Sequence, residues 1–203
     1  MKKSVLSVLT ALLLTQSAAF SSEVEYSGLA EISTGTIVGS DDFSIRGVQK
    51  SRIIDEGMQD NSSALTTIGG GLDATNRQFK FQLIGSLGRL SNGDLTSNVI
   101  KVDAAAYYMG ALTSKLGIGF HVSNLSFLSP SWSGNADIKL GDSNAIAEGI
   151  AVIFGDELAI KATLDYVSGS KFSVDHVPNG VVVSDKSISI DGTMAQVALL
   201  YKF

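Results

Sequence analysis

Residues 193–203 have the sequence TMAQVALLYKF, and in an extended strand its successive side chains point to opposite faces. One face would carry Thr193, Ala195, Val197, Leu199, Tyr201 and Phe203, and the other Met194, Gln196, Ala198, Leu200 and Lys202. Such strict alternation is typical of a β-strand whose two faces meet different surroundings. It is the clearest strand signal in the chain.

Six further segments show the same period of two, some of them weakly, and a seventh, residues 144–154, is apolar on both faces. They cover residues 24–36, 63–75, 79–87, 100–108, 114–124, 144–154 and 158–166. The gaps between strands are alternately short and long. The short ones are Asn76-Arg77, Gly110 to Thr113 and Gly155-Asp156, the long ones are 37–62, 125–143 and 169–188, and Ser91 to Asp94 is intermediate. This spacing predicts an all-β fold, an up-and-down antiparallel transmembrane β-barrel of eight strands, with tight turns at one end and longer loops at the other.

The amino-acid composition excludes several classes of protein function. The 203 residues include no cysteine, which excludes disulfide scaffolds, Cys-ligated zinc, iron–sulfur clusters and thiol catalysis. With only two histidines there is no His-rich metal site, so no metal or cofactor is expected. After the N-terminus no apolar run approaches the roughly 18 residues of a membrane-spanning helix.

The N-terminal residues resemble a targeting segment rather than part of the fold. Met1-Lys2-Lys3 is a basic region, Val5 to Thr15 is apolar, and small residues up to Ser21 offer a cleavage site. This pattern predicts a cleaved Sec-type signal peptide over residues 1–21 and a barrel domain over 22–203. Without Lys2 and Lys3 the chain has 13 basic and 20 acidic residues, a net charge of −7. An acidic surface repels phosphates, so no nucleic-acid partner is expected.

Alternation alone suits both a soluble barrel and one in lipid, but three features favour lipid. Each outward face carries four to six apolar residues, the other face mixes charged, amide and small side chains, and aromatic residues gather at the turn-side strand ends. This predicted aromatic girdle comprises Tyr26, Phe79, Phe81, Tyr108 and Phe154, with Tyr201 and Phe203 beside it. At the opposite end only Phe120 and Tyr166 stand out.

The pattern Val197-x-Leu199-x-Tyr201-x-Phe203 resembles the C-terminal assembly signal of bacterial outer-membrane β-barrels. In strand number the chain is similar to the small OmpA/OmpX-type barrels, without a subfamily being identified. The resemblance implies a monomeric protein of the cell outer membrane. It also implies contact with outer-membrane lipid and lipopolysaccharide, and recognition of the last strand by the barrel-assembly machinery.

Turn positions predict which residues face each other. A turn at Asn76-Arg77 would set Asp73 opposite Lys80, one at Asn92-Gly93 would set Gln82 opposite Asp103, and one at Ala111 to Thr113 would bring His121 opposite Asp103. The hairpin signal Pro178-Asn179-Gly180 would pair Tyr166 with Thr193 and Leu158 with Tyr201. Segment 144–154 fits poorly: an inward Glu148 leaves Ala145, Ala147, Gly149 and Ala151 outside, so a bulge is expected there.

The inward faces supply a predicted polar network in the lumen. Its members are Glu31, Asp73, Lys80, Lys101, Asp103, His121, Glu148, Lys161 and Asp165. Because an eight-stranded barrel is just wide enough for its own side chains, we expect these charges to pair and fill the lumen. That predicts a barrel with a structural and surface-interaction role. A narrow porin-like channel for small solutes or ions is the alternative.

One motif suggests catalysis. The stretch His121-Val122-Ser123-Asn124 resembles the H-x-S-N motif of outer-membrane lipid A deacylases, in which a histidine activates a serine. Here the motif lies on the fifth strand rather than near the C-terminus, and both side chains are assigned to the lumen rather than to the lipid side. We therefore expect no enzyme. Gly69-Gly70-Gly71 is not a phosphate loop, because no helix follows; it indicates close backbone approach.

The longer loops hold the remaining candidates for binding. The first is rich in charge of both signs, with Asp41, Asp42, Arg46, Lys50, Arg52, Asp55, Glu56 and Asp60. The third contains Phe127, Leu128, Pro130 and Trp132, which are expected to be exposed for a partner, for lipopolysaccharide or for anchoring at the membrane interface.

Overall fold

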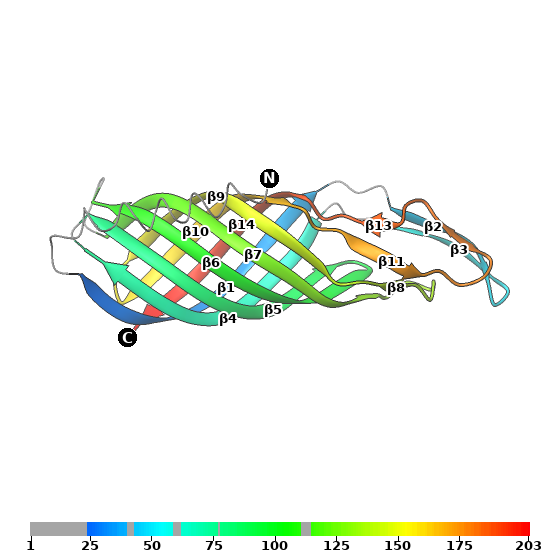
Figure 1. Cartoon of the computed structure of the whole chain (residues 1–203), viewed down its shortest axis with the longest axis horizontal. Helices are drawn as coiled ribbons and strands as arrows, with labels where there is room; N and C mark the ends of the chain where they lie inside the picture. Colours follow the sequence, from blue (N-terminus) through cyan, green and yellow to red (C-terminus); the bar gives the residue numbers. More distant parts are fainter. Residues whose placement is uncertain (1–23, 40–42, 59–61, 77, 111–114) are drawn as a thin grey trace.

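The computed structural model describes residues 24–39, 43–58, 62–76, 78–110 and 115–203. Eight long strands form a closed antiparallel barrel in which β14 pairs with β1 (Figure 1). They are β1 (Glu25–Gly39), β4 (Ser62–Thr75), β5 (Phe79–Asn92), β6 (Leu95–Met109), β7 (Leu116–Trp132), β9 (Ser143–Gly155), β10 (Leu158–Ser168) and β14 (Gly192–Lys202). The predicted eight-stranded barrel is thus confirmed. No helix among these residues is long and apolar enough to cross a membrane.

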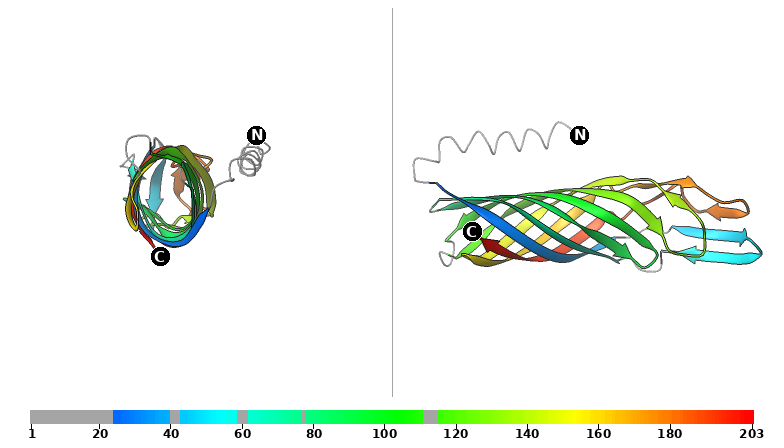
Figure 2. Two further views of the ribbon diagram at one scale, coloured as in Figure 1. Left: turned by 90° about the vertical axis from the view of Figure 1, so that its left-hand side faces the viewer. Right: turned by 90° about the horizontal axis from the view of Figure 1, so that it is seen from below.

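Six short strands form an extension beyond the loop end of the barrel (Figures 1 and 2). One three-stranded sheet has the order β12-β2-β3, with β2 at Ser44–Gln49, β3 at Arg52–Gly57 and β12 at Val181–Val183. The other has the order β13-β11-β8, with β8 at Lys139–Leu140, β11 at Phe172–His176 and β13 at Ser187–Ile188. The signal segment 1–21, the turn residues Arg77 and 111–113, and the loop acids Asp41, Asp42 and Asp60 lie outside the described residues.

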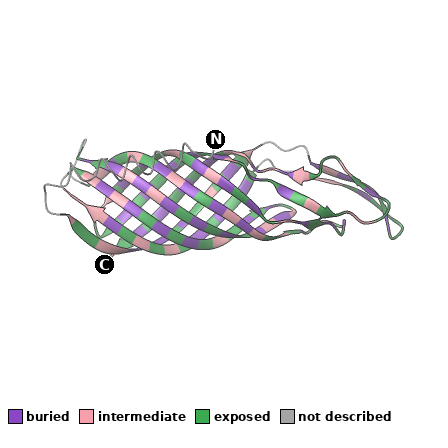
Figure 3. Cartoon of the chain, in the orientation of Figure 1, coloured by how far each residue is buried: buried purple, intermediate pink, exposed green. Residues whose placement is uncertain are grey.

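The strands are staggered. Following paired residues once around the barrel from Ser27 leads back to β1 at Ile37, ten residues further along. Stagger and strand number together set the width of a barrel, and eight strands leave an interior that side chains can fill. The burial pattern alternates along every barrel strand, with inward side chains buried and outward ones exposed (Figure 3).

The predicted register is right in one strand pair and wrong by two residues in three others. Leu158 pairs with Tyr201 and Tyr166 with Thr193, as predicted. The predicted hairpin at Asn179-Gly180 is wrong, however, because the flanking strands pair elsewhere: β11 with β8 and β13, and β12 with β2. By contrast Gln82, not Lys80, lies opposite Asp73. Asp103 lies opposite Ile84 on β5 and Ser123 on β7, so neither Gln82 nor His121 faces it.

The first of these shifts has a visible cause in the turn after β4. The side-chain oxygen of Asn76 accepts hydrogen bonds from the backbone N–H groups of Gln78, at 2.9 Å, and Phe79, at 2.7 Å. Gln78 is thereby drawn into the turn, and the backbone N–H of Asn76 donates to the carbonyl oxygen of Phe79 at 2.9 Å. The turn is therefore displaced by one residue along the chain, which shifts the register by two. A shift of two residues keeps every side chain on its predicted face.

The prediction that Glu148 faces the lumen is wrong. Strand β9 pairs regularly with both neighbours, with no bulge, and Glu148 lies exposed on the outside of the barrel opposite Tyr166. An inward Glu148 would have turned Ile150, Val152 and Phe154 into the polar lumen. Because these three apolar side chains are more stable on the lipid-facing exterior, their face of β9 points outward and carries Glu148 with it. The small alanines of β9 face inward instead. The irregular pairing lies elsewhere, between β6 and β7 near Thr96.

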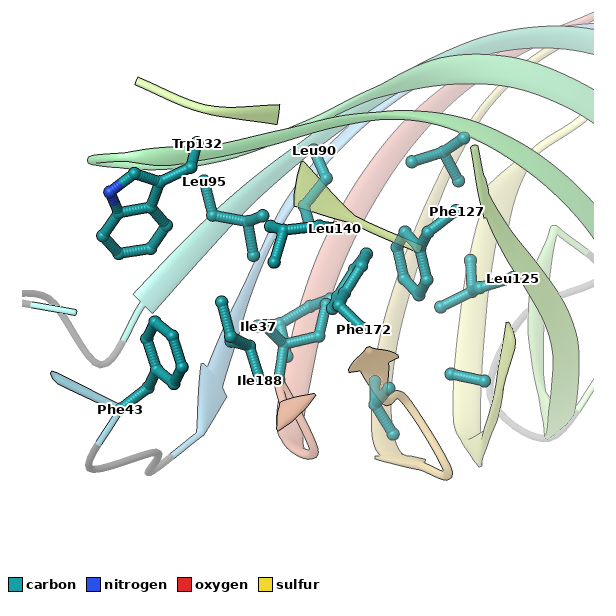
Figure 4. Close-up of a cluster of buried hydrophobic side chains, with 14 of the residues drawn as sticks. Ile37, Phe43, Leu90, Leu95, Leu125, Phe127, Trp132, Leu140, Phe172 and Ile188 are labelled. Carbon is teal, nitrogen blue, oxygen red and sulfur yellow. The ribbon is translucent and has the colours of Figure 1, made fainter. Parts of the chain in front are cut away.

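The polarity of the barrel inverts along its axis. On β6 the inward residues change from Lys101 to the apolar Val99, while the outward ones change from Ile100 to Asn98. On the turn side of this level the exterior of the barrel is apolar, as lipid requires. On the loop side the interior is apolar, as in a water-soluble protein. The interior there forms an apolar cap that joins the loop end of the barrel to the extension (Figure 4). Its members include Ile37, Phe43, Leu90, Leu95, Leu125, Phe127, Trp132, Leu140, Phe172 and Ile188.

Candidate functional site: a charge network in the lumen

Six ionisable side chains meet inside the barrel and form what we call the charge network. They come from four strands: Glu31 on β1, Lys101 and Asp103 on β6, His121 on β7, and Lys161 and Asp165 on β10. All are at most 3% exposed. Residues two apart on a strand share a face, which places Lys101 with Asp103 toward the lumen. The strand stagger then brings β1 and β10 to the same level.

Ion pairs link the lysines to the carboxylates. Lys101 Nζ lies 2.9 Å from Asp103 Oδ2 and 3.4 Å from Glu31 Oε1. Lys161 Nζ forms a close ion pair with Glu31 Oε2 and lies 3.6 Å from Asp103 Oδ2. Lys101 also donates to the amide oxygen of Gln196 at 3.1 Å. Each lysine therefore contacts two carboxylates, and this offsets the large cost of removing an ammonium group from water.

The second part of the network centres on the imidazole of His121. Its Nδ1 lies 2.9 Å from Asp165 Oδ1, and its Nε2 lies 3.4 Å from Asp103 Oδ1. Thr163 donates a hydrogen bond of 2.7 Å to the other oxygen of Asp165, and Ser123 donates to Asp103. Three carboxylates face two lysines and this imidazole, so the network is neutral when His121 is charged.

Two more predicted lumen residues lie nearer the turns. Lys80 Nζ is 3.5 Å from Asp73 Oδ2, and both side chains are buried. The lysine reaches across the two-residue difference in register. Eight of the nine predicted lumen residues therefore lie inside the barrel, in two groups, and Glu148 does not. Sequence reasoning missed Gln196 and Thr163; their polar side chains at inward positions were the available signal.

Apolar layers enclose the charge network on both sides along the barrel axis. On the loop side lies the apolar cap, and on the turn side a second cluster of buried residues. That second cluster consists of Leu29, Ile84, Ala105, Tyr107, Met109, Ala151, Ile153, Ala159, Ala198 and Leu200. An ion entering from either end would leave water for an apolar layer, which is costly.

The arrangement of Ser123, His121 and Asp165 has the distances of a hydrolytic triad. Ser123 Oγ lies 3.2 Å from His121 Nε2, whose other nitrogen contacts Asp165. Yet the serine hydroxyl donates to Asp103, and both Ser123 and His121 are buried in the lumen. A hydroxyl committed to a carboxylate and shielded from lipid is poorly placed to attack an acyl chain. Among the described residues no group of three histidine or acidic side chains is arranged to hold a metal ion.

The prediction that the third loop exposes aromatic residues is wrong. Strand β7 continues to Trp132, and both Phe127 and Trp132 are buried in the apolar cap (Figure 4). The Phe127 ring packs on that of Phe172, with centroids 5.4 Å apart, and Trp132 packs on Phe43 at 5.7 Å. The cause is the inversion of polarity, because above the boundary aromatic side chains belong inside.

Glu56 connects the extension by hydrogen bonds to the end of β7 and the segment that follows it. Its carboxylate accepts hydrogen bonds from the indole of Trp132 at 3.2 Å, and from the backbone N–H groups of Asn135 at 2.6 Å and Ala136 at 3.3 Å. Burial alone would raise the pKa of Glu56, but these hydrogen bonds outweigh it and hold the pKa below its usual range.

This contact predicts a pH-dependent extension. A carboxyl whose pKa is depressed by folding stabilises the fold at neutral pH, and loses that effect as the pH falls below its ordinary range of about 4.3. The protein has a single tryptophan, so emission from Trp132 reports this contact. We expect the emission to shift to longer wavelength on acidification in the wild type. In Glu56→Gln this shift of the emission should be absent, and in the control Glu157→Gln it should persist. An emission shift that persists in Glu56→Gln would contradict the role of Glu56.

The exterior carries the predicted girdle and the terminal pattern. Tyr26, Tyr108 and Phe154 are exposed, and Phe79 and Phe81 are half-exposed on the same side. Their rings associate, with Phe79 centroids 5.7 Å from Tyr108 and 6.5 Å from Phe81. The four residues of the terminal pattern, Val197, Leu199, Tyr201 and Phe203, all face outward.

No protein-family model and no curated protein sequence matches the chain. Three solved structures of outer-membrane proteins are similar to it. The outer membrane protein OprG from Pseudomonas aeruginosa has 12% identity and a TM-score of 0.45, over 87% of this chain and 95% of that one. The translocator domain of the autotransporter NalP from Neisseria meningitidis has 11% identity and a TM-score of 0.37, over 100% and 97%. The COG4313 outer membrane channel from Pseudomonas putida F1 has 10% identity and a TM-score of 0.27, over 87% and 95%. At these values we rest the functional assignment on the side chains of this chain.

Proposed function

We propose that this protein is a monomeric integral outer-membrane barrel with a structural role, whose extension makes contacts at the cell surface. The observation that supports this most is the closed lumen, in which paired charges lie between two apolar layers. A lumen filled in this way serves the stability of the wall rather than transport.

Three features support the outer-membrane location. The wall is apolar outside and polar inside, an arrangement that is stable only in lipid. The N-terminal segment predicts export, and the outward-facing Val197, Leu199, Tyr201 and Phe203 form the pattern that assembly machinery would recognise. Lipid and lipopolysaccharide are the expected neighbours of the wall.

The extension supports a surface role because its inward apolar side chains are buried in the apolar cap that it shares with the loop end of the barrel. The two three-stranded sheets bury Ile45, Ile54 and Leu140 in the apolar cap, so the segment can stand in water without lipid. On the outer face of the β12-β2-β3 sheet, the exposed ion pair between Arg46 and Asp55, at 3.3 Å, lies among the exposed apolar side chains of Val48, Ile53 and Val182. We assign no catalytic role, since the Ser123 hydroxyl is committed to Asp103.

Planar-bilayer recording tests the closed lumen against the alternative of a narrow channel. We expect the purified, folded protein to insert without producing steady unitary conductance steps, because ions would have to cross the apolar cap. Insertion is verified separately, from the difference in gel mobility between unheated and boiled samples recovered from the same lipid. Steady steps of one size from folded protein would overturn the closed lumen and favour the channel.

A further inference from the structure

A second polar group lies in the turn-side part of the lumen. It consists of Asp73 on β4, Lys80 and Gln82 on β5, and Tyr107 on β6, each at most 4% exposed. Asp73 is paired with Gln82 across β4 and β5, and Lys80 with Tyr107 across β5 and β6. The four side chains thus form one continuous patch on the inner wall, which we call the turn-side pocket.

Several polar atoms of this pocket are buried without a hydrogen-bond partner in the protein. They are both side-chain amide atoms of Gln82, the hydroxyl of Tyr107 and Oδ2 of Asp73, whose nearest cation is Lys80. Ser27, opposite Asp73 on β1, has an unpartnered hydroxyl as well. The amide of Gln196 beside the charge network, unlike that of Gln82, has both partners: it accepts from Lys101 and donates to Ser33. Buried polar groups almost always have partners, because leaving them unpaired costs stability.

The chemistry of the pocket defines what can partner these atoms. The amide of Gln82 needs both a donor and an acceptor, and the Tyr107 hydroxyl can serve as either. The paired charges of Asp73 and Lys80 cancel, so the pocket favours a neutral molecule over an ion. All four side chains are almost completely buried, which excludes a large molecule. Water fits each of these requirements, and buried waters typically form about three hydrogen bonds.

We propose that the turn-side pocket binds ordered water molecules that bridge Asp73, Gln82 and Tyr107. The next inward residue on β5, Ile84, is buried and apolar, and it belongs to the same cluster as Tyr107. This inference does not depend on the proposed surface role.

X-ray radiolytic footprinting of the folded protein in detergent micelles tests the proposal directly. Microsecond irradiation turns bound water into hydroxyl radicals, which oxidise adjacent side chains, and mass spectrometry locates the products. Tyr107 serves as the reporter, and Phe127 and Phe172, buried in the apolar cap, serve as dry references. We expect Tyr107 to be oxidised at least about ten-fold faster than either phenylalanine, since only its site offers polar partners for water.

The variant Gln82→Leu removes the main polar partner while keeping a similar volume, and it should lower the oxidation of Tyr107 several-fold. The control Gln49→Leu alters a buried glutamine of the extension, whose amide oxygen already accepts from Asp137, and should leave Tyr107 unchanged. Oxidation of Tyr107 in the wild-type protein as slow as that of Phe127 would overturn the proposal even if a variant fails to fold. Oxidation of Tyr107 that Gln82→Leu leaves unaltered would also overturn it.

Discussion

Replacing Glu31 by alanine will destabilise the folded barrel by about 3–5 kcal/mol, the usual cost of removing one member of a buried ion pair. Lys161 loses its closest carboxylate, and Lys101 keeps only Asp103 as a charged partner. Both ammonium groups stay buried in a lumen that the neighbouring apolar layers close to water. The effect is measured as the shift of the urea unfolding midpoint, followed by the difference in gel mobility between folded and unfolded protein.

Two variants show whether the effect comes from the buried charges. Glu25→Ala removes an acid whose side chain is 78% exposed and lies 4.0 Å from Lys202, and it should change stability by at most about 1 kcal/mol. The double variant Glu31→Ala with Lys161→Ala should cost less than the sum of the single ones, because it removes both members of the pair. Equal losses for Glu25→Ala and Glu31→Ala would refute the role of the network.

The variant Gly71→Ala is expected to prevent the barrel from closing properly. Gly71 faces inward on β4, and a Cβ atom there would collide with the backbone carbonyl oxygen of Leu83 on β5. Backbone pinned in a closed sheet cannot yield as a flexible side chain does, so we expect a loss at or above the upper end of overpacking costs, about 3 kcal/mol. The yield of folded protein on dilution from urea into detergent measures this.

Gly85 provides a matched control from the neighbouring strand. It faces outward and pairs with Gly70, the neighbour of Gly71, and an added Cβ would meet no atom within 4 Å. Gly85→Ala should therefore fold as well as the wild type. If both alanine variants fold equally well, the close approach of β4 and β5 is not what requires glycine in the run Gly69-Gly70-Gly71.

The sequence was sufficient to predict the strands and almost all of their faces, because both depend on local patterns. Period-two alternation places Asp103 and Lys161 inside, and the spacing of gaps places all tight turns at one end. Register depends instead on how each turn is hydrogen-bonded. The side chain of Asn76 draws Gln78 into its turn, and composition does not reveal such a choice between similar turns.

Two other predictions fail for different reasons. An inward Glu148 follows from the rule that charged side chains of the barrel face the lumen, and an exposed Trp132 follows from assigning residues 125–143 to a loop. Glu148 lies toward the loop end of the outer surface, and Trp132 lies where the interior is apolar. Recognising the change from Lys101 to Val99 on β6 would have placed Trp132, although not Glu148, correctly.

The inversion of polarity along the strands also fixes the depth of the protein in its membrane. A uniformly amphipathic barrel could slide along the membrane normal at little cost, since each level of its wall would suit lipid equally. Here, sinking by one step would bring Asn98 into hydrocarbon, and rising by one step would bring Ile100 into water. The boundary on β6 thus marks the level of the membrane surface on the barrel wall, and it keeps the extension at a constant height above the lipid.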